Sequence, residues 1–180
     1  MADLDNPEKY KSKKDRYNRI KAPKAYADKN GLKFAVREKH KNMQEVLHLY
    51  DKWVEQKVER GVFRVNFPVA RYRHCITRIG KVKNLVGVEC RDKDKNLIAY
   101  RVVYLDKLEE GLRGYDLAFF SDLGITQISS VFNYMSLYYM REMNDLKSFN
   151  CGLSGGSLKD FKKRYPHTVR ESYATQGQYV

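Results

Sequence analysis

The sequence has no uninterrupted apolar run that approaches the roughly 18 residues needed for a membrane-spanning helix. Its N-terminus is charged from Asp3 onward and carries no apolar core of the kind that a secretory signal peptide requires. These two absences predict a protein without a membrane partner that stays in the cytoplasm.

Cysteine is also scarce. The chain has three cysteines, an odd number without paired spacing, which argues against a disulfide framework and against a cysteine-rich zinc site. Cys75, Cys90 and Cys151 lie in apolar or strand-like stretches, so we expect buried free thiols. His74 beside Cys75 is not a metal pair, because neighbouring residues of a strand face opposite ways. No bound metal is predicted.

Acidic residues are few relative to basic ones. The chain has 35 lysines and arginines against 22 acidic residues, which gives a net charge of +13 and a pI of about 9.6. A surplus of this size indicates an acidic partner, and nucleic acid is the commonest one. Hydrophobic residues still make up 42% of the chain, which is enough for the core of one folded domain.

A basic run covers residues 9–24, where eight lysines and arginines face the single acid Asp15. Tyrosines are interleaved with these bases and apolar periodicity is poor, which is typical of an arm that becomes ordered on a polyanion. The sequence therefore predicts a flexible basic arm over residues 1–31 and a folded domain over residues 32–180. We expect Lys13, Lys14 and Arg16 of the arm to contact nucleic-acid phosphates; a purely solubilising tail is the alternative.

The folded part mixes the two periodicities of strands and helices. Asn42 is a candidate N-cap and Gly61 a candidate stop for one helix. A loop containing Gly111 and Gly114 is expected before the third strand of the central region. The predicted class is α/β (α+β), with a mixed sheet flanked by helices. The expected strands are 33–38, 85–91, 97–105, 115–121, 148–152 and one near 169–174; the expected helices are about 43–58, 125–143 and 157–164.

A second basic segment lies inside the folded part, at residues 60–83, and contains no acid. Arginine suits forked contacts with phosphate and stacking on bases. We expect a shaped nucleic-acid surface here, with a loop of ordinary solvated arginines as the alternative. The residues predicted to contact nucleic acid in this segment are Arg71, Arg73, Arg78 and Lys81.

Residues 149–166 read as a strand, a Gly/Ser loop and the start of a helix with Ser157 as its N-cap. Backbone N–H groups at such a helix start favour an anion, although a plain turn is the alternative. The loop also matches G-x-S-x-G around Ser154. A serine hydrolase is disfavoured, because the short remainder of the chain holds a single histidine, His167.

The order of elements and the segment NCGLSGGSLKDFKKRYP resemble the GNAT superfamily of acyltransferases. The likeness is to its divergent branches, which include aminoacyl-transfer enzymes of the Fem and lysyl-phosphatidylglycerol synthase type and phage Mom-like DNA modification proteins. The resemblance implies that the sheet opens between the 115–121 and 148–152 strands and that an acyl donor enters there. The implied donor-binding residues are Asn150, Gly152, Ser154, Gly155, Gly156 and Lys162.

The resemblance also implies where the catalytic groups lie. Acyl transfer needs a positioned amine, a group that takes its proton and hydrogen-bond donors for the carbonyl oxygen. Asp116 or Asp122 is expected to act as the base or to orient the amine. Ser129 or Ser130 is expected to contact the acceptor or donor, and Tyr139 or Tyr165 to be the acid that protonates the leaving group. Core packing is the alternative for each tyrosine.

One stretch departs from the GNAT pattern. Most GNAT enzymes cradle the pyrophosphate of coenzyme A in a Q/R-x-x-G-x-G/A loop, whereas residues 121–126 here read SDLGIT, with one glycine and an acid. The superfamily implies acyl-CoA as the donor, and this departure makes an aminoacyl-type donor the alternative.

Three readings of function follow from the sequence. The first is an N-acyltransferase that modifies an amine on a DNA or RNA base, with DNA favoured and a phage origin expected. The second is a non-catalytic nucleic-acid-binding protein on the same scaffold. The third is a GNAT-like enzyme that acts on a protein or a small amine.

Overall fold

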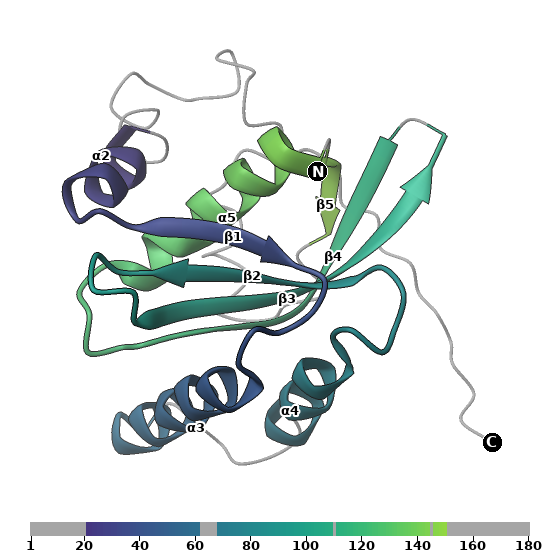
Figure 1. The fold of residues 1–180 in the computed structure, drawn as a ribbon. Coiled ribbons are helices and arrows are strands. Elements are labelled where there is room, and N and C mark those ends of the chain that lie inside the picture. The colour runs from purple at the N-terminus through teal and green to yellow at the C-terminus, as the bar shows by residue number, and fades with distance from the viewer. Residues whose placement is uncertain (1–20, 62–67, 110, 145, 151–180) are drawn as a thin grey trace.

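The structure is a computed structural model that describes residues 21–61, 68–109, 111–144 and 146–150. Within these ranges the chain forms a five-stranded sheet with helices on both faces (Figure 1). The α+β class and the helix-flanked mixed sheet predicted from the sequence are confirmed. In chain order the elements are α2 (Ala22–Lys29), β1 (Lys33–Arg37), α3 (Met43–Glu59), α4 (Pro68–Arg78), β2 (Leu85–Arg91), β3 (Leu97–Leu108), β4 (Gly111–Ser121), α5 (Ile128–Asn144) and β5 (Leu146–Asn150).

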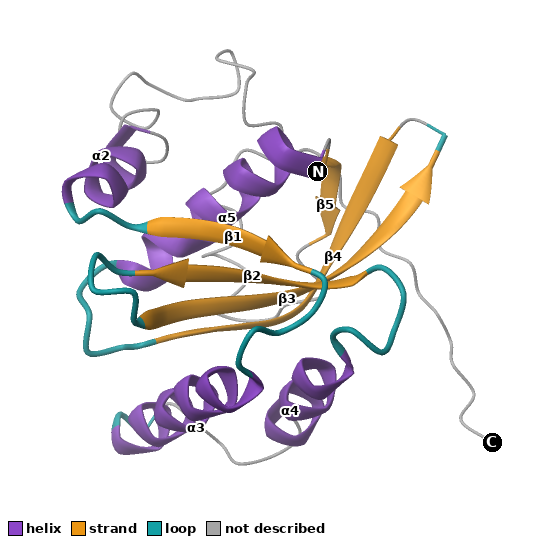
Figure 2. Cartoon of the chain, viewed as in Figure 1, coloured by secondary structure: helices purple, strands orange, loops and turns teal. Residues whose placement is uncertain are grey.

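The strands lie in the order β1-β2-β3-β4-β5. The first four pair antiparallel, and β5 pairs parallel with β4. Parallel neighbours need a long connection, and α5 supplies it by crossing one face of the sheet between them. Helices α3 and α4 cover the opposite face (Figure 2).

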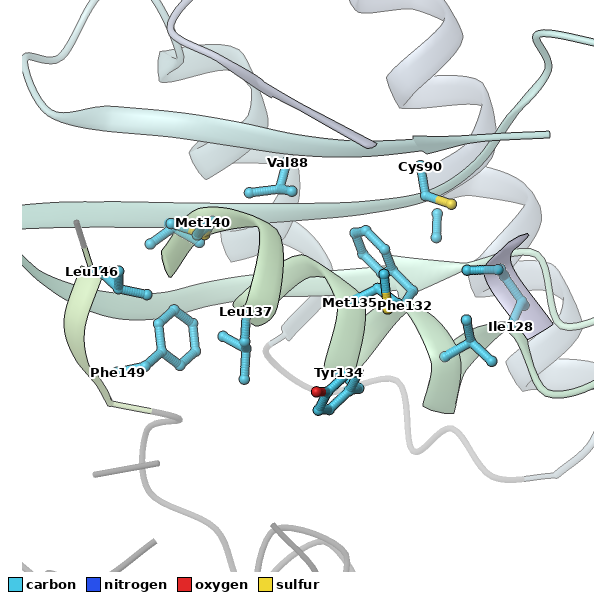
Figure 3. Close-up of a cluster of buried hydrophobic side chains, with 14 of the residues drawn as sticks. Val88, Cys90, Ile128, Phe132, Tyr134, Met135, Leu137, Met140, Leu146 and Phe149 are labelled. Carbon is cyan, nitrogen blue, oxygen red and sulfur yellow. The ribbon is translucent and has the colours of Figure 1, made fainter. Parts of the chain in front are cut away.

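Each face of the sheet buries its own apolar cluster. On one face, Phe132 and Met140 of α5 pack with Val88 of β2 and with Phe149 of β5 (Figure 3). On the other face, aromatic and branched side chains of α3 and α4 pack against β3 and β4, among them Tyr50, Ile76, Val102 and Phe120. The sheet is therefore buried on both sides, which explains why β2 and the first half of β3 are apolar almost throughout.

Helix α3 forms as its sequence predicts. The Asn42 side chain accepts hydrogen bonds from the backbone N–H groups of Gln44 and Glu45, at 3.1 and 3.3 Å, which caps the helix start. At the other end Gly61 has φ +63°, a left-handed conformation that favours glycine and ends the helix. Both predictions are confirmed.

Four expected elements differ from the structure. The basic segment contains the helix α4, which the sequence reading missed because three arginines dilute its few apolar residues, of which Ile76 is buried and Tyr72 partly buried. Gly111 and Gly114 lie within β4, not in a loop; a Cβ at Gly114 would stand 2.6 Å from the Phe149 ring, so this glycine lets β5 approach. Helix α5 begins at residue 128 instead of 125, because the preceding residues form a turn in which Gln127 has φ +65°. Strand β5 begins at residue 146 instead of 148. Its expected last residues, 151 and 152, lie outside the described residues.

Part of the predicted arm is helical. Residues Ala22–Lys29 form α2, and Ala27, which is 2% exposed, belongs to the core under α5. The Tyr26 hydroxyl donates to the Thr126 carbonyl oxygen at 2.9 Å and ties this helix to the turn before α5. These residues lie with the folded domain, although the predicted division placed them in the arm. The division itself stays a prediction, since residues 1–20 lie outside the described residues.

Candidate active site

Among the described residues, only the first half of strand β4 is paired with a neighbouring strand on both sides. Residues 112–115 pair with β5, while β3 pairs along the whole strand. The last β4–β5 pair joins Tyr115 and Asn150, the last described residue of β5. Beyond this pair the described residues give β4 a partner on its β3 side only. This is the place where the family resemblance puts the acyl donor.

A β-bulge lies in β4 directly after this point. Val102 of β3 is opposite Ala118 and Val103 is opposite Asp116, so Leu117 is an extra residue on β4. Leu117 and Ala118 both pack with the apolar side chains of α3 and α4, so two successive side chains lie on the same face of the sheet. The alternation of side chains between the two faces is therefore shifted by one residue. Asp116 consequently shares the α5 face with its partner Val103, where simple alternation from Ala118 would have turned it toward α3 and α4.

On that face Asp116 lies beside a buried arginine. Arg101 of β3 is 1% exposed, and its Nε lies 3.5 Å from Asp116 Oδ1. Its two terminal nitrogens donate to Ser136 Oγ, at 2.9 Å, and to Asn133 Oδ1, both on α5. Aromatic rings surround the guanidinium, with centroids 4.9, 6.0 and 5.3 Å away, from Phe119, Phe132 and Phe149.

This arrangement pairs a fully buried positive charge with a carboxylate whose side chain is 15% exposed. An isolated buried charge is costly, and hydrogen bonds from α5 together with the aromatic faces make the burial of Arg101 tolerable. The negative charge of Asp116 also interacts with a group on the other face of the sheet. Burial raises the pKa of the Tyr72 hydroxyl on α4, and the charge of Asp116 adds to this effect. Asp116 therefore lies at the edge of β4 within electrostatic reach of both faces.

Asp122, the other predicted base, has different surroundings. Its carboxylate accepts hydrogen bonds from Lys52 Nζ at 2.7 Å, Gln56 Nε2 at 2.9 Å and the backbone N–H of Gly124 at 2.9 Å. Burial alone would raise the pKa of Asp122, but these hydrogen bonds and the charge of Lys52 outweigh it and hold the pKa below the usual range. A carboxylate that is already occupied in this way is a poor proton acceptor, and its geometry is that of a link between α3 and the β4–α5 turn.

The remaining predicted catalytic residues are not brought together. Ser129 lies at the start of α5, where its hydroxyl is 2.7 Å from that of Ser121. Tyr139 packs against Phe34 of β1, the strand at the far edge of the sheet from β5, so the structure separates it from Asp116. Tyr165 lies outside the described residues.

Most of the predicted donor-binding segment is also not described. The backbone of Asn150 ends the β4–β5 pairing. The other members lie outside the described residues: Gly152, Ser154, Gly155, Gly156 and Lys162. Their roles stay predictions.

The described residues predicted to contact nucleic acid lie on α4 and the loop after it. Arg71 and Arg78 are exposed and, being seven residues apart in a helix, share one side of α4. Arg73 is exposed too, but its guanidinium donates to both Asp51 carboxylate oxygens, at 2.5 and 2.8 Å. Lys81 is exposed in the following turn. Lys13, Lys14 and Arg16 lie outside the described residues.

Other candidate features of the described chain lie away from Asp116. Two shallow hollows, of about 430 and 390 Å³, lie beside the β2–β3 turn and contain neither Asp116 nor Arg101. Among the residues that the structure describes, no cluster of three or more His, Cys, Asp or Glu side chains could hold a metal ion. No described helix has both the length and the apolar composition to cross a membrane. Cys90 is a buried free thiol, as predicted, and burial raises its pKa to about 12. Cys75 is free but only partly buried, and Cys151 lies outside the described residues.

The sequence reading missed Arg101. The available signal was an arginine within the strand LIAYRVVYL, whose other residues are apolar or aromatic. Arginine is almost never fully buried without a partner, so a charge in such a strand points to a buried counter-charge. Nothing in the sequence indicated that Tyr72 lies within electrostatic reach of Asp116.

Comparison with solved structures identifies this architecture. The chain is similar to L-PGS from Bacillus licheniformis, with a TM-score of 0.59 and 16% identity over 91% of this chain, although it spans only 54% of that protein. It is similar to a GNAT family acetyltransferase from Staphylococcus aureus, with a TM-score of 0.53 and 12% identity over 81% of this chain and 97% of the other. A ribosomal-protein-alanine N-acetyltransferase from Brucella melitensis gives a TM-score of 0.51 and 13% identity, over 79% and 96% of the two chains.

The sequence alone finds no such relatives. No family model matches the chain, and neither does any curated protein. Identities this low carry the fold and not the substrate. The antiparallel strands β1–β4, the α5 crossover and the parallel β4–β5 pair nevertheless agree with these neighbours, and the chain has the GNAT fold in a divergent form.

Proposed function

We propose that this protein transfers an acyl or aminoacyl group to an amine on a nucleic-acid base, with Asp116 as the proton acceptor. The observation that carries the proposal is the Asp116–Arg101 pair, which lies where the described β4–β5 pairing stops. A fold shared with GNAT acyltransferases makes the same point of the sheet the expected position of the donor.

The edge of β4 offers a way to hold an extended donor. Beyond Tyr115 its backbone groups have no described strand partner on the β5 side. An extended chain can add to such an edge through main-chain hydrogen bonds, as a peptide does in β-augmentation. The bulge at Leu117 breaks the regular ladder here and re-aims the strand. The reactive carbonyl of a donor held along this edge would lie close to Asp116.

The chemical step follows from this placement. The amine nitrogen attacks the donor carbonyl carbon, so that a C–N bond forms and the bond to the leaving group breaks. The Asp116 carboxylate takes the amine proton, and Tyr165 remains the predicted donor of a proton to the leaving group. Arg101 does not touch the substrate in this scheme. Its contacts with Asn133 and Ser136 hold the guanidinium, and its positive charge attracts the Asp116 carboxylate, whose Oδ1 lies 3.5 Å from Nε.

Charge supports a nucleic acid as the acceptor. The net charge is +13, and α4 contains three arginines and no acid. Arg71 and Arg78 lie exposed on one side of the helix and are suited to phosphate contacts. Because Arg73 is paired with Asp51, we expect it to contribute less than these two. DNA as the preferred acceptor and a phage origin remain expectations.

The experiment compares nucleosides from DNA and tRNA of cells that express the wild-type protein or Asp116→Asn. We expect a heavier nucleoside, detected by mass spectrometry, that falls by about 10²–10⁴-fold in the variant, the range typical of losing a general base. Asp94→Asn is the matched control, because Asp94 is an exposed carboxylate in the β2–β3 turn. It should leave the modified nucleoside unchanged.

The same experiment separates the alternative function. Asn is close to Asp in shape, and circular dichroism would show that the variant is folded. A modified nucleoside that persists in folded Asp116→Asn would remove Asp116 from the chemistry. An unmodified pool in wild-type cells, with salt-sensitive binding of DNA or RNA retained by the purified chain, would favour the non-catalytic nucleic-acid-binding protein.

A further inference from the structure

The GNAT fold implies a coenzyme A donor, whose pyrophosphate would be held by the turn between β4 and α5. A turn can bind pyrophosphate when its backbone N–H groups point outward and nothing else accepts from them. Residues 122–127 form that turn here, and the use of their N–H groups tests whether they suit coenzyme A.

Consecutive N–H groups of the turn already have acceptors inside the protein. The N–H of Leu123 donates to Gln56 Oε1 at 2.8 Å, and that of Gly124 to Asp122 Oδ1 at 2.9 Å. The N–H of Ile125 donates to the Asp122 carbonyl oxygen at 3.2 Å, and the N–H of Asp122 itself to the Ile98 carbonyl oxygen at 2.9 Å. Four successive donors are therefore used to fold the turn on itself and onto its neighbours.

Helix α3 holds the turn in this conformation. Lys52, Gln56 and Arg60 follow one another at intervals of four residues and so form one stripe along the helix. Lys52 and Gln56 bind the Asp122 carboxylate, and the Arg60 guanidinium donates to the Leu123 carbonyl oxygen at 2.8 Å. Both the side chain and the backbone of the turn are thus bound by the same stripe.

The Asp122 carboxylate accepts from the Gly124 N–H, a donor that a glycine loop would leave to a phosphate. A Cβ at Gly124 would stand 3.1 Å from Asp122 Oδ1, so the single glycine of the turn gives room to this carboxylate. A pyrophosphate near the same N–H groups would meet a negative charge and would have to displace the hydrogen bonds from Gln56 and Asp122. Residues 122–125, whose N–H groups are all used and which carry a carboxylate, do not fit a coenzyme A pyrophosphate.

We infer that the β4–α5 turn is closed to a donor's pyrophosphate, so that the donor is not a coenzyme A thioester but an activated carboxyl, such as an aminoacyl ester, on a carrier that is not anchored at this turn. This inference rests on the proposed function for the site, but it concerns donor choice and can fail alone. Asp122, with Gln56, is then a specificity-determining residue and not a base.

The first test is a titration of the full chain with coenzyme A, in which binding is measured by calorimetry and the melting temperature by thermal denaturation. We expect no saturable binding and no shift in melting temperature at coenzyme A concentrations up to about 1 mM. At that concentration, a ligand with a Kd of about 10 µM would be present at about a hundred times its Kd and would raise the melting temperature. Saturable binding below that concentration would overturn the inference. A cooperative melt of the same sample shows that the protein is folded.

The second test opens the turn. The double variant Gln56→Ala with Asp122→Gly frees the N–H groups of Leu123 and Gly124 and removes the carboxylate. We expect its affinity for coenzyme A to rise at least tenfold over the wild type. If the folded double variant gains nothing, these side chains do not exclude the pyrophosphate.

The nucleoside assay distinguishes the two proposals. An added mass that corresponds to an amino-acid residue supports the inference. An added acetyl group would overturn it and leave the acyl transfer standing. The absence of any modified nucleoside would remove the proposed function, while the coenzyme A titration would still decide whether the turn is closed.

Discussion

Asp116 and Asp122 flank the second half of β4, yet their carboxylates have opposite surroundings. Asp122 faces α3 and accepts from a half-exposed lysine, an amide and a backbone N–H. Asp116 faces α5, beside an arginine that is 1% exposed and surrounded by aromatic rings. The sequence treated the two as equivalent candidates for one role. The comparison shows that a carboxylate's position on a strand matters less than what the opposite helix presents to it.

The comparison predicts its largest effect on activity. Asp122→Asn should keep the modified nucleoside within about tenfold of the wild-type amount, while Asp116→Asn loses about 10²–10⁴-fold. The reason is that Asp122 already accepts three hydrogen bonds, whereas Asp116 lies at the edge where the donor is expected. Equal losses of modified nucleoside in the two variants, measured by mass spectrometry, would show that the two aspartates do not differ in their role.

The second prediction compares the two cations. Arg101→Met should lower the free energy of unfolding by about 3 kcal/mol, because it removes the Arg101 charge from an ion pair in which the Asp116 side chain is only 15% exposed. Lys52→Met should cost less than about 1 kcal/mol, because the Lys52 side chain is 46% exposed. Urea denaturation of both variants measures the difference. A smaller loss of unfolding free energy for Arg101→Met than for Lys52→Met would show that the ion pair with Asp116 does not stabilise the fold.

A third prediction concerns the α3 stripe. Gln56→Ala removes the acceptor of the Leu123 N–H and one donor to Asp122. We expect a loss of about 1 kcal/mol, since water can reach the exposed side of the turn and replace part of both bonds. Gln44→Ala, at an exposed position near the start of the same helix, is a control that should change stability by less than about 0.5 kcal/mol.

The smallest expected effect depends on pH. The folded-state pKa of Asp122 lies below its ordinary value of 3.8, so the unfolded chain binds the proton more readily. This carboxylate therefore stabilises the fold above about pH 4, and the contribution is lost as the pH falls through the lower folded-state value. The difference in unfolding free energy between wild type and Asp122→Asn should shrink from pH 6 to pH 3. A difference that grows on acidification would contradict the lowered pKa.

Much of the fold could be predicted because local patterns are strong there. The Asn42 cap, the apolar spacing of α3 and the hairpin of β2 and β3 all depend on neighbours in the sequence. The helix α4 was missed because its apolar residues are diluted by arginines, and their burial depends on the sheet that they meet. Gly114 was read as part of a loop because its requirement for glycine comes from Phe149, which lies far away in the sequence.

The sequence by itself determined the α+β class, the positive charge and the departure of the SDLGIT turn from the GNAT pattern. Only the tertiary structure decided which aspartate belongs to the site. One extra residue at Leu117 reverses the alternation of β4 and turns Asp116 toward Arg101, and α3 reaches across to occupy Asp122. Both outcomes depend on strand register and helix packing, which bring together side chains that no local pattern connects.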